Sequence, residues 1–311
     1  MSKAEMHKAL ITSAGTDVAR RKHNEDAFLV ERETGLVIVA DGVGGHQAGE
    51  VASGITCEVI SASVKAGDDL SEAIRQSNRA VMAAVAAGKG REGMASTVVA
   101  AVFDGPQYRI DWVGDSRAYL WDGQLHLITR DHSYVAAQLE LGKITLEQAR
   151  DHPRKNVIVQ AIGLQSDDSL RVDTRSGCLA PGETLLLCSD GLNDVLESAQ
   201  IAQILASERS PQEQCEALIA DTVQAGGRDN VTVAIVRAGD TLDSTGTRPE
   251  VVWSYDPATG EHLGLPEVVG VEITQPNVRR VTPKSRQATQ MMPVAQVEAM
   301  RQLAVKADRR K

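Results

Sequence analysis

The chain has 311 residues and a formal net charge of −9, and its isoelectric point is near 5.3. This negative charge excludes a general nucleic-acid or anionic-membrane binder, because such proteins need a positive field. This length suits one domain of about 240 residues and a smaller additional part. The four cysteines are scattered, and the sequence has no signal-peptide core and no apolar run near ~18 residues, so we predict a cytoplasmic protein with free thiols and no membrane span.

Apolar runs and the alternation of apolar with polar residues predict strands along most of the chain. The predicted strands, in chain order, are residues 8–14, 27–31, 36–40, 96–103, 108–113, 117–121, 125–128, 170–174, 184–188 and 231–236. Turn sequences such as DGPQ and WDGQ separate neighbouring strands. This spacing favours antiparallel pairing.

Helical periodicity interrupts the strands in pairs. One predicted pair of helices covers residues 48–66 and 70–88, and a second covers residues 197–208 and 210–226. Strands that are grouped, with helices that come in twos, predict an α+β fold and not a βαβ repeat. In this fold two packed antiparallel β-sheets form a central sandwich, and pairs of α-helices flank it.

Five aspartates lie at the ends of predicted strands, each beside glycine or asparagine. They are Asp26, Asp41, Asp115, Asp190 and Asp229. Each one taken alone is more readily explained as a turn residue or a helix cap. Carboxylates gathered at one sheet edge repel each other, however, and are tolerated mainly when a cation neutralises them. Oxygen ligands without nearby pairs of cysteine or histidine favour Mg²⁺ or Mn²⁺ over zinc or copper.

The motifs around these aspartates resemble those of the bacterial metal-dependent protein phosphatases, the PPM or protein phosphatase 2C family, over residues 8–238. Eight blocks occur in the order of that family: RKHNEDAF, VADGVGGHQAGEVAS, GMASTVVAAV, VGDSRAYL, TRDHS, HPRKNVIVQAIG, LLLCSDGLNDVL and GGRDNVTV. The resemblance implies an enzyme with a four-layer αββα sandwich and a binuclear Mg²⁺ or Mn²⁺ centre. It also implies hydrolysis of phosphoserine and phosphothreonine in proteins, which reverses the action of Ser/Thr kinases.

The resemblance assigns a role to each aspartate near the centre. Asp41 would bridge two metals, and the carbonyl of Gly42 would bind one of them. Asp190 and Asp229 would be ligands of the first metal, and Asp26 would be a ligand or an acceptor from metal-bound water. The two cations would lower the pKa of a water molecule that they share towards neutrality, and so produce a hydroxide. This hydroxide would attack the phosphorus atom in line, and no phosphoenzyme would form.

Two further site residues follow from the same resemblance. Asp115, together with Asp190, would hold a weaker third metal, and Arg21 would bind the substrate phosphate through its planar fork. Taken alone, Arg21 is more readily a solvated member of the basic run RRK.

The leaving-group acid is left open by the sequence. Eukaryotic members of the family often carry a histidine directly after the Asp-Gly pair, whereas this chain has Val43 there and His46 three residues later. His46 could serve as the acid, but a histidine in a glycine-rich turn is more often a structural hydrogen-bonding group.

Two other functions stay open as alternatives. One is a catalytically weak phosphoprotein-binding regulator, which would lack part of the carboxylate set that is complete here. The other is a different two-metal hydrolase such as a nuclease, which would need a basic groove. The expected partners are phosphorylated proteins, including a cognate Ser/Thr kinase or its substrates, and no nucleic acid is expected.

A polar helical insertion at residues 131–160 corresponds to the variable flap beside the site in this family. We expect this flap to select substrates, because binding residues are often carried by segments inserted between rigid elements.

Residues 239–311 are predicted to be a linker and a C-terminal extension. The stretch around Trp253 and Tyr255 could pack on the catalytic domain or form a small hairpin. Residues 277–311 hold nine Lys or Arg against two acids, a net +7, which is consistent with a solvated tail or with a basic amphipathic helix that docks on an acidic surface. Truncation after residue 240 is expected to leave hydrolysis of a small substrate within a few-fold of the full-length chain.

Overall fold

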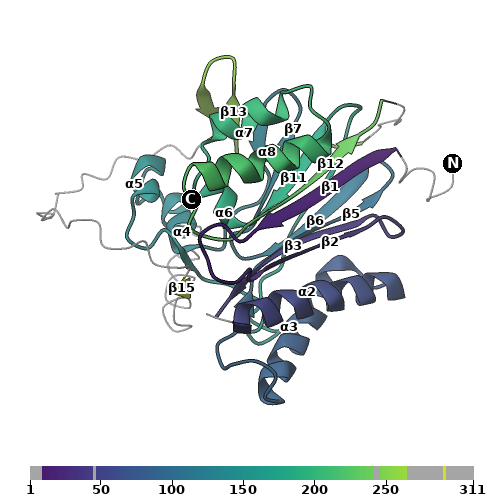
Figure 1. Cartoon of the computed structure of the whole chain (residues 1–311), viewed down its shortest axis with the longest axis vertical. Coiled ribbons are helices and arrows are strands. Elements are labelled where there is room, and N and C mark those ends of the chain that lie inside the picture. Colours follow the sequence, from purple (N-terminus) through teal and green to yellow (C-terminus); the bar gives the residue numbers. More distant parts are fainter. Residues whose placement is uncertain (1–8, 45–46, 241–245, 265–289, 292–311) are drawn as a thin grey trace, which may run out of the picture. The chain divides into compact units, whose positions relative to one another are not determined.

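Figure 1 shows the computed structural model, which describes residues 9–44, 47–240, 246–264 and 290–291. The chain divides into two compact units. The larger unit contains Met1–Arg130 and Gln160–Gly264, and the smaller unit contains Asp131–Val159 and Leu265–Lys311.

Two antiparallel sheets form the centre of the larger unit. The first sheet has the strand order β1-β12-β11-β7-β8-β13-β14, with the bounds β1 Leu10–Asp17, β7 Arg117–Trp121, β8 Leu125–Leu127, β11 Thr184–Cys188, β12 Val231–Ala238, β13 Trp253–Asp256 and β14 Glu261–Leu263. The second sheet has the order β10-β6-β5-β3-β2, with β4 paired to β3, and its bounds are β2 Asp26–Glu31, β3 Leu36–Val43, β4 Ala95–Ser96, β5 Val98–Asp104, β6 Gln107–Val113 and β10 Asp173–Cys178. All of these pairs are antiparallel, as predicted.

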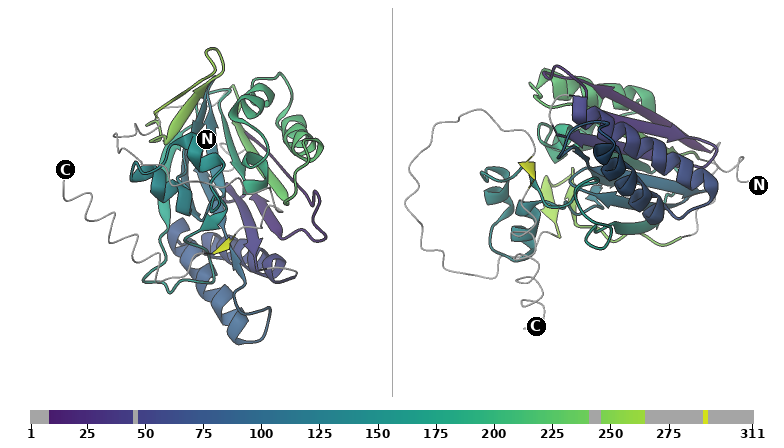
Figure 2. Two further views of the ribbon diagram at one scale, coloured as in Figure 1. Left: turned by 90° about the vertical axis from the view of Figure 1, so that its left-hand side faces the viewer. Right: turned by 90° about the horizontal axis from the view of Figure 1, so that it is seen from below.

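Central strands such as β3, β11 and β12 are buried on both faces, which explains why they read as nearly continuous apolar runs. Between the sheets, Val99 and Trp112 of the second sheet pack with Leu185 of the first. Two groups of helices cover the outer faces: α2 Gln47–Ala66 and α3 Leu70–Ala86 on the second sheet, and α6 Asp190–Asn193, α7 Ser198–Leu205 and α8 Pro211–Gln224 on the first. Figure 2 shows these groups on opposite sides of the sheets, so the four-layer α+β sandwich is confirmed.

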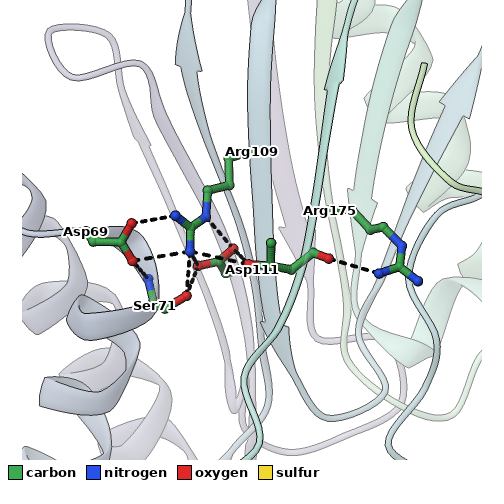
Figure 3. A network of polar contacts seen from close by, with 6 residues as sticks. Asp69, Ser71, Arg109, Asp111 and Arg175 are labelled. Atoms are coloured by element: carbon green, nitrogen blue, oxygen red, sulfur yellow. Dashed lines mark hydrogen bonds and ion pairs between the residues drawn. The ribbon is translucent and has the colours of Figure 1, made fainter. Parts of the chain in front are cut away.

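A polar network attaches the start of α3 to the second sheet (Figure 3). Asp111 of β6 has no exposed surface, and it accepts hydrogen bonds from Ser71 Oγ at 2.5 Å and from Arg109 Nε at 2.9 Å. Asp69 accepts from Arg109 at 3.2 Å and caps α3 by accepting from the Ser71 N–H at 2.9 Å. Because a buried carboxylate is tolerated only when its oxygens are paired, the network fixes the helix pair on the sheet.

The smaller unit has short elements: α4 Tyr134–Glu140, α5 Leu146–Arg150, β9 Val157–Ile158 and β15 Gln290–Met291. Ser133 caps α4 by accepting a hydrogen bond from the Ala136 N–H at 3.2 Å. The ring of Tyr134 lies 5.3 Å from the ring of His152 and 5.0 Å from the guanidinium carbon of Arg154. The polar insertion therefore contains two short helices, as its composition indicated, and a short strand that was not expected.

Some segments differ from the expectations or extend them. The strand predicted at residues 170–174 is instead β10, Asp173–Cys178, an edge strand whose largely polar sequence hides its pattern. In the extension, β13 and β14 form a hairpin, and β13 joins the first sheet beside β8. The basic helix hypothesised within residues 277–311 lies outside the described residues, apart from 290–291.

The four cysteines all lie in the described ranges, where they are free and buried. Within those same ranges, the structure has no helix that is both long and apolar enough to cross a bilayer.

Candidate metal and phosphate site

The register of β2 and β3 places two of the expected site residues opposite each other. Asp26, the first residue of β2, pairs with Asp41 of β3. Burial is the main cause that raises the pKa of Asp41 well above its ordinary value, and nearby carboxylates raise it further, namely Asp26, Asp190, Asp229 and Asp115. The structure therefore brings all five aspartates together, although they come from the ends of strands in both sheets.

Asp26 is held by two hydroxyl groups, one from Thr232 in β12 and one from Ser189, which directly follows β11. One of its oxygens, Oδ2, accepts from Ser189 Oγ at 2.8 Å and from Thr232 Oγ1 at 2.7 Å. Its other oxygen, Oδ1, is buried and has no hydrogen-bond partner among the described residues. Burial raises the pKa of Asp26 to about 6, although the two hydroxyl donors act in the opposite direction.

The hydroxyl of Thr97 links the strand end at Asp41 with the turn that carries Asp115. Thr97 Oγ1 accepts from the Asp41 N–H at 3.3 Å and shares a hydrogen bond with Ser116 Oγ at 2.7 Å. The Thr97 N–H donates to the Asp41 carbonyl at 2.8 Å. Gly114 has φ +110°, and a Cβ there would lie 2.6 Å from Thr97 Cβ, so the turn can approach Thr97 only as glycine.

Replacing Thr97 with valine should weaken Mn²⁺ binding by about tenfold, because the shape is kept while buried polar groups of Asp41 and Ser116 lose a partner. The measurement is a calorimetric titration with Mn²⁺. The matched control is Thr97→Ser, which keeps the hydroxyl and should bind Mn²⁺ nearly as the parent does. A Thr97→Val protein with parental affinity would show that Thr97 does not position the carboxylates.

Gly42 brings the end of β3 against the start of α2. Its N–H donates to the Glu25 carbonyl at 3.0 Å, and a Cβ at this position would collide with the Gly49 carbonyl. Ser53 Oγ of α2 donates to the same Glu25 carbonyl at 2.6 Å. Because only glycine permits this approach, the backbone next to Asp41 is fixed in place.

Arg21 forms an ion pair with Asp229, in which Nη2 and Oδ2 are 2.6 Å apart. The side chain of Arg21 is 37% exposed and that of Asp229 is 33% exposed, so the pair faces solvent. The next residue, Asn230, donates to the carbonyls of Val18 and His23, both at 3.1 Å, and accepts from the Glu25 N–H at 2.8 Å. Asn230 thereby holds the loop that carries Arg21 on the strand that follows Asp229.

Asp190 is the first residue of α6 and is 7% exposed. Burial is the main cause that raises its pKa well above the ordinary value, followed by the charge of Asp115. Glu25 is a further carboxylate beside the cluster, and its pKa is raised mainly by burial. Its Oε1 is buried without a hydrogen-bond partner in the described part of the chain.

Among the described residues, no three His, Cys, Asp or Glu side chains are placed so that they could hold a metal ion together. The types of donor that gather here nevertheless suit a hard divalent cation. The carboxylates are near enough to raise one another's pKa, and Arg21 is the cation that pairs with Asp229. Asp26 Oδ1 and Glu25 Oε1 are buried oxygens that a cation or its water would satisfy. A set made only of oxygen donors suits Mg²⁺ or Mn²⁺.

Several residues of this site were not singled out from the sequence. Thr97, Ser189, Asn230 and Thr232 are polar residues in or beside apolar strands, and Glu25 looks like an ordinary surface acid. Only their position in the sequence could have pointed to them, since each lies next to a motif aspartate or inside a motif block. His46, which was considered as the acid, lies outside the described residues.

Known proteins resemble this chain in sequence and in fold. Residues 16–225, more than half of the chain, match the family Protein phosphatase 2C. The serine/threonine phosphatase stp of Listeria innocua is 37% identical over 236 residues, which cover 71% of this chain and 93% of that protein. The structure of the Mycobacterium tuberculosis serine/threonine phosphatase PstP/Ppp matches with a TM-score of 0.66 at 34% identity, over 74% of this chain and 99% of that one. The catalytic domain of PstP in complex with two manganese ions matches over the same shares, with a TM-score of 0.66 at 32% identity.

The matched span begins before Arg21 and includes most of the motif blocks, and both sheets agree with the solved folds. Sequence, fold and the gathered carboxylates point to one family. The chain belongs to the bacterial branch of the metal-dependent protein phosphatase 2C family.

Proposed function

We propose that this chain hydrolyses phosphoserine and phosphothreonine in proteins at a centre of two Mn²⁺ or Mg²⁺ ions. Membership of the family makes it a protein-serine/threonine phosphatase. The observation that carries the finer proposal is the gathering of the five aspartates around Asp41, with Arg21 on one of them.

The proposed ligands are Asp41, Asp190, Asp229 and the Gly42 carbonyl, with Asp26 as a ligand or an acceptor from bound water. When bound, the two cations supply the Lewis acidity that lowers the pKa of water and offsets charge on the phosphoryl oxygens. Ser189 and Thr232 occupy Oδ2 of Asp26. This leaves Oδ1 as the acceptor that can hold a proton donor, such as the attacking water, in a fixed place.

Arg21 is proposed to bind the substrate phosphate. A guanidinium group presents parallel N–H donors that suit two phosphate oxygens, and this one is exposed to solvent beside Asp229. Its present partner is Asp229. A metal ion bound to Asp229 would neutralise the carboxylate that now pairs with Arg21. Metal binding would therefore weaken this ion pair and free the guanidinium group of Arg21 to bind the phosphate.

The experiment that tests the function measures phosphate released from a phosphothreonine peptide. Release should require Mn²⁺ or Mg²⁺, stop with EDTA, and continue in the presence of reagents that block serine or cysteine nucleophiles. Metal-dependent binding of the peptide without any release would support the phosphoprotein-binding regulator instead.

Replacing Asp115 with alanine should damage phosphopeptide turnover while leaving most of the bound metal, because only the proposed third site loses a ligand. Asp115 is 6% exposed and acts on the pKa of both Asp41 and Asp190, which places it beside the cluster. Turnover and bound Mn²⁺ are measured on the same samples at limiting Mn²⁺. Unchanged turnover under those conditions would remove the third-site role.

The flap, residues 131–160, is proposed to select among phosphoproteins, including those made by a cognate kinase. Exchange of the flap with that of another family member should change the preference among phosphopeptides, and an unchanged preference would argue against this role. The cytoplasmic location stays a prediction.

A further inference from the structure

Within the smaller unit, the end of the flap is paired with a segment from the C-terminal extension. β15 runs parallel to β9, with Gln290 opposite Val157 and Met291 opposite Ile158. On its other side β9 is already paired, because Ile158 forms an antiparallel bridge with Ser133 and the Val159 N–H donates to the His132 carbonyl at 2.7 Å. β15 therefore occupies the one edge of β9 that the flap itself leaves open.

Within the larger unit, an earlier part of the same extension pairs with the strand that leads into the flap. β13 lies antiparallel to β8, with Trp253 opposite Leu127 and Tyr255 opposite Leu125. The Val252 N–H also donates to the Leu127 carbonyl at 2.7 Å. β8 ends four residues before Asp131, so the extension forms strand pairs at both sequence ends of the flap.

We propose that the open edge of β9 is a docking site for an extended peptide, and that residues 290–291 occupy it as an intramolecular inhibitor of phosphoprotein hydrolysis. An open strand edge offers backbone N–H and C=O groups that any extended segment can pair with. While β15 pairs there, the flank of a phosphoprotein cannot. This inference rests on the proposed phosphatase activity and on the flap as a selector of substrates.

Charge separates this proposal from simple electrostatic docking of the tail. Residues 131–159 hold four acids and four Lys or Arg, so the flap has no net charge to attract the basic residues 277–311. Backbone pairing is screened little by salt, whereas attraction between exposed charges weakens strongly beyond a Debye length of about 8 Å at physiological salt. The inhibition should therefore persist at high salt.

The test compares the full chain with the double variant Gln290→Pro/Met291→Pro, which removes both backbone donors of β15. The matched control is Gln287→Pro/Ala288→Pro, which places the same two prolines outside the pair. For the first variant, kcat/KM on a phosphothreonine peptide with long flanks should rise about five- to tenfold, as expected from the loss of one or two competing hydrogen bonds. Hydrolysis of p-nitrophenyl phosphate should not change in either variant.

Amide hydrogen exchange provides a readout that does not depend on turnover. In the Gln290→Pro/Met291→Pro variant, a peptide that covers residues 155–160 should exchange faster than in the control. A synthetic peptide of residues 286–296 should inhibit phosphopeptide hydrolysis by a chain that ends at Gly264, at low and at high salt. Unchanged exchange, or equal kcat/KM for the two proline variants, would overturn the proposal. Absence of p-nitrophenyl phosphate hydrolysis in the parent chain would instead contradict the proposed function.

Discussion

Replacing Asp41 with asparagine should abolish Mn²⁺-dependent phosphate release and at the same time raise the melting temperature of the metal-free protein. The loss of activity follows because Asp41 is the proposed ligand of both cations. The gain in stability follows because the pKa of Asp41 is raised by burial and by four neighbouring carboxylates, so its charge opposes folding when no cation is bound. Asp190→Asn should behave in the same way, since the pKa of Asp190 is raised for similar reasons.

The metal-free protein should become less stable to unfolding as pH rises. The pKa of Asp26 rises from the ordinary value of 3.8 to about 6 in the folded chain, and that of Asp41 also rises. The folded state therefore holds protons that the unfolded chain has already released, and stability falls as pH increases. Melting temperatures in EDTA should be highest near the acid end of this window and should fall as pH rises through about 6. The Asp41→Asn protein should show a smaller fall.

The control for both effects is Asp104→Asn, which removes an exposed carboxylate at the end of β5. It should leave Mn²⁺-dependent phosphate release and the melting temperature in EDTA as in the parent. Near-parental turnover in Asp41→Asn or in Asp190→Asn would overturn the binuclear assignment. A lower melting temperature in EDTA for both variants would show that the carboxylates do not repel each other as their pKa shifts indicate.

Truncation after Asp240 should lower the melting temperature by about ten degrees relative to truncation after Gly264. The first cut removes β13 and β14, including Tyr255, which is 9% exposed and packs with Leu125 and Leu127 in one apolar cluster. Loss of a buried aromatic side chain costs about 3–5 kcal/mol, and each kcal/mol lowers the melting temperature by about 2–4 °C in a domain of this size.

Polar contacts of the extension with the larger unit add to this effect. Arg248 donates to Glu183 at 2.6 Å, and Arg175 lies 3.2 Å from Glu250. His126 shares a hydrogen bond with Ser254 Oγ at 2.6 Å. Hydrolysis of p-nitrophenyl phosphate well below the melting temperature should stay within a few-fold of the full chain for both truncated proteins, because no described residue of the hairpin lies among the proposed ligands.

Thermal melts of the two truncated proteins in one buffer are the measurement. As a control that leaves the chain length unchanged, Trp253→Ala in the chain that ends at Gly264 should cause part of the fall in melting temperature. Trp253 packs on the same apolar cluster as Tyr255. Equal melting temperatures for the two truncated chains would mean that the hairpin does not stabilise the larger unit. The catalytic domain would then end at residue 238, as the sequence predicts, without the hairpin.

Much of the sandwich could be predicted because its strands are buried on both faces. Runs such as residues 36–40 and 185–188 are continuously apolar, and they lie in β3 and β11. Edge strands carry a weaker signal, which is why β10 was expected three residues too early. The hairpin could be suspected from Trp253 and Tyr255, but its pairing with β8 depends on tertiary contacts that no local pattern encodes.

The aspartates of the site could be located for a physical reason, since a charged residue directly after a buried strand is conspicuous. Their supports could not be located in this way. Thr97 and Thr232 look like ordinary β-branched strand residues, and only the structure shows that their hydroxyls meet Asp41 and Asp26. The pairing of β15 with β9 joins segments more than a hundred residues apart, and its two residues have no strand pattern in the sequence.

The β2–β3 ladder ends at Glu31 and Leu36 beside the loop that connects the two strands. Asp26 and Asp41 face each other at the opposite end of the ladder. A hairpin that grows from its turn forms this repulsive pair last, because the pairs nearest the turn close the shortest loops. An unfavourable contact made after the transition state accelerates unfolding and leaves the rate of folding nearly unchanged. The carboxylate pair therefore shortens the lifetime of the folded metal-free chain, and a cation held between the two strands would lengthen it.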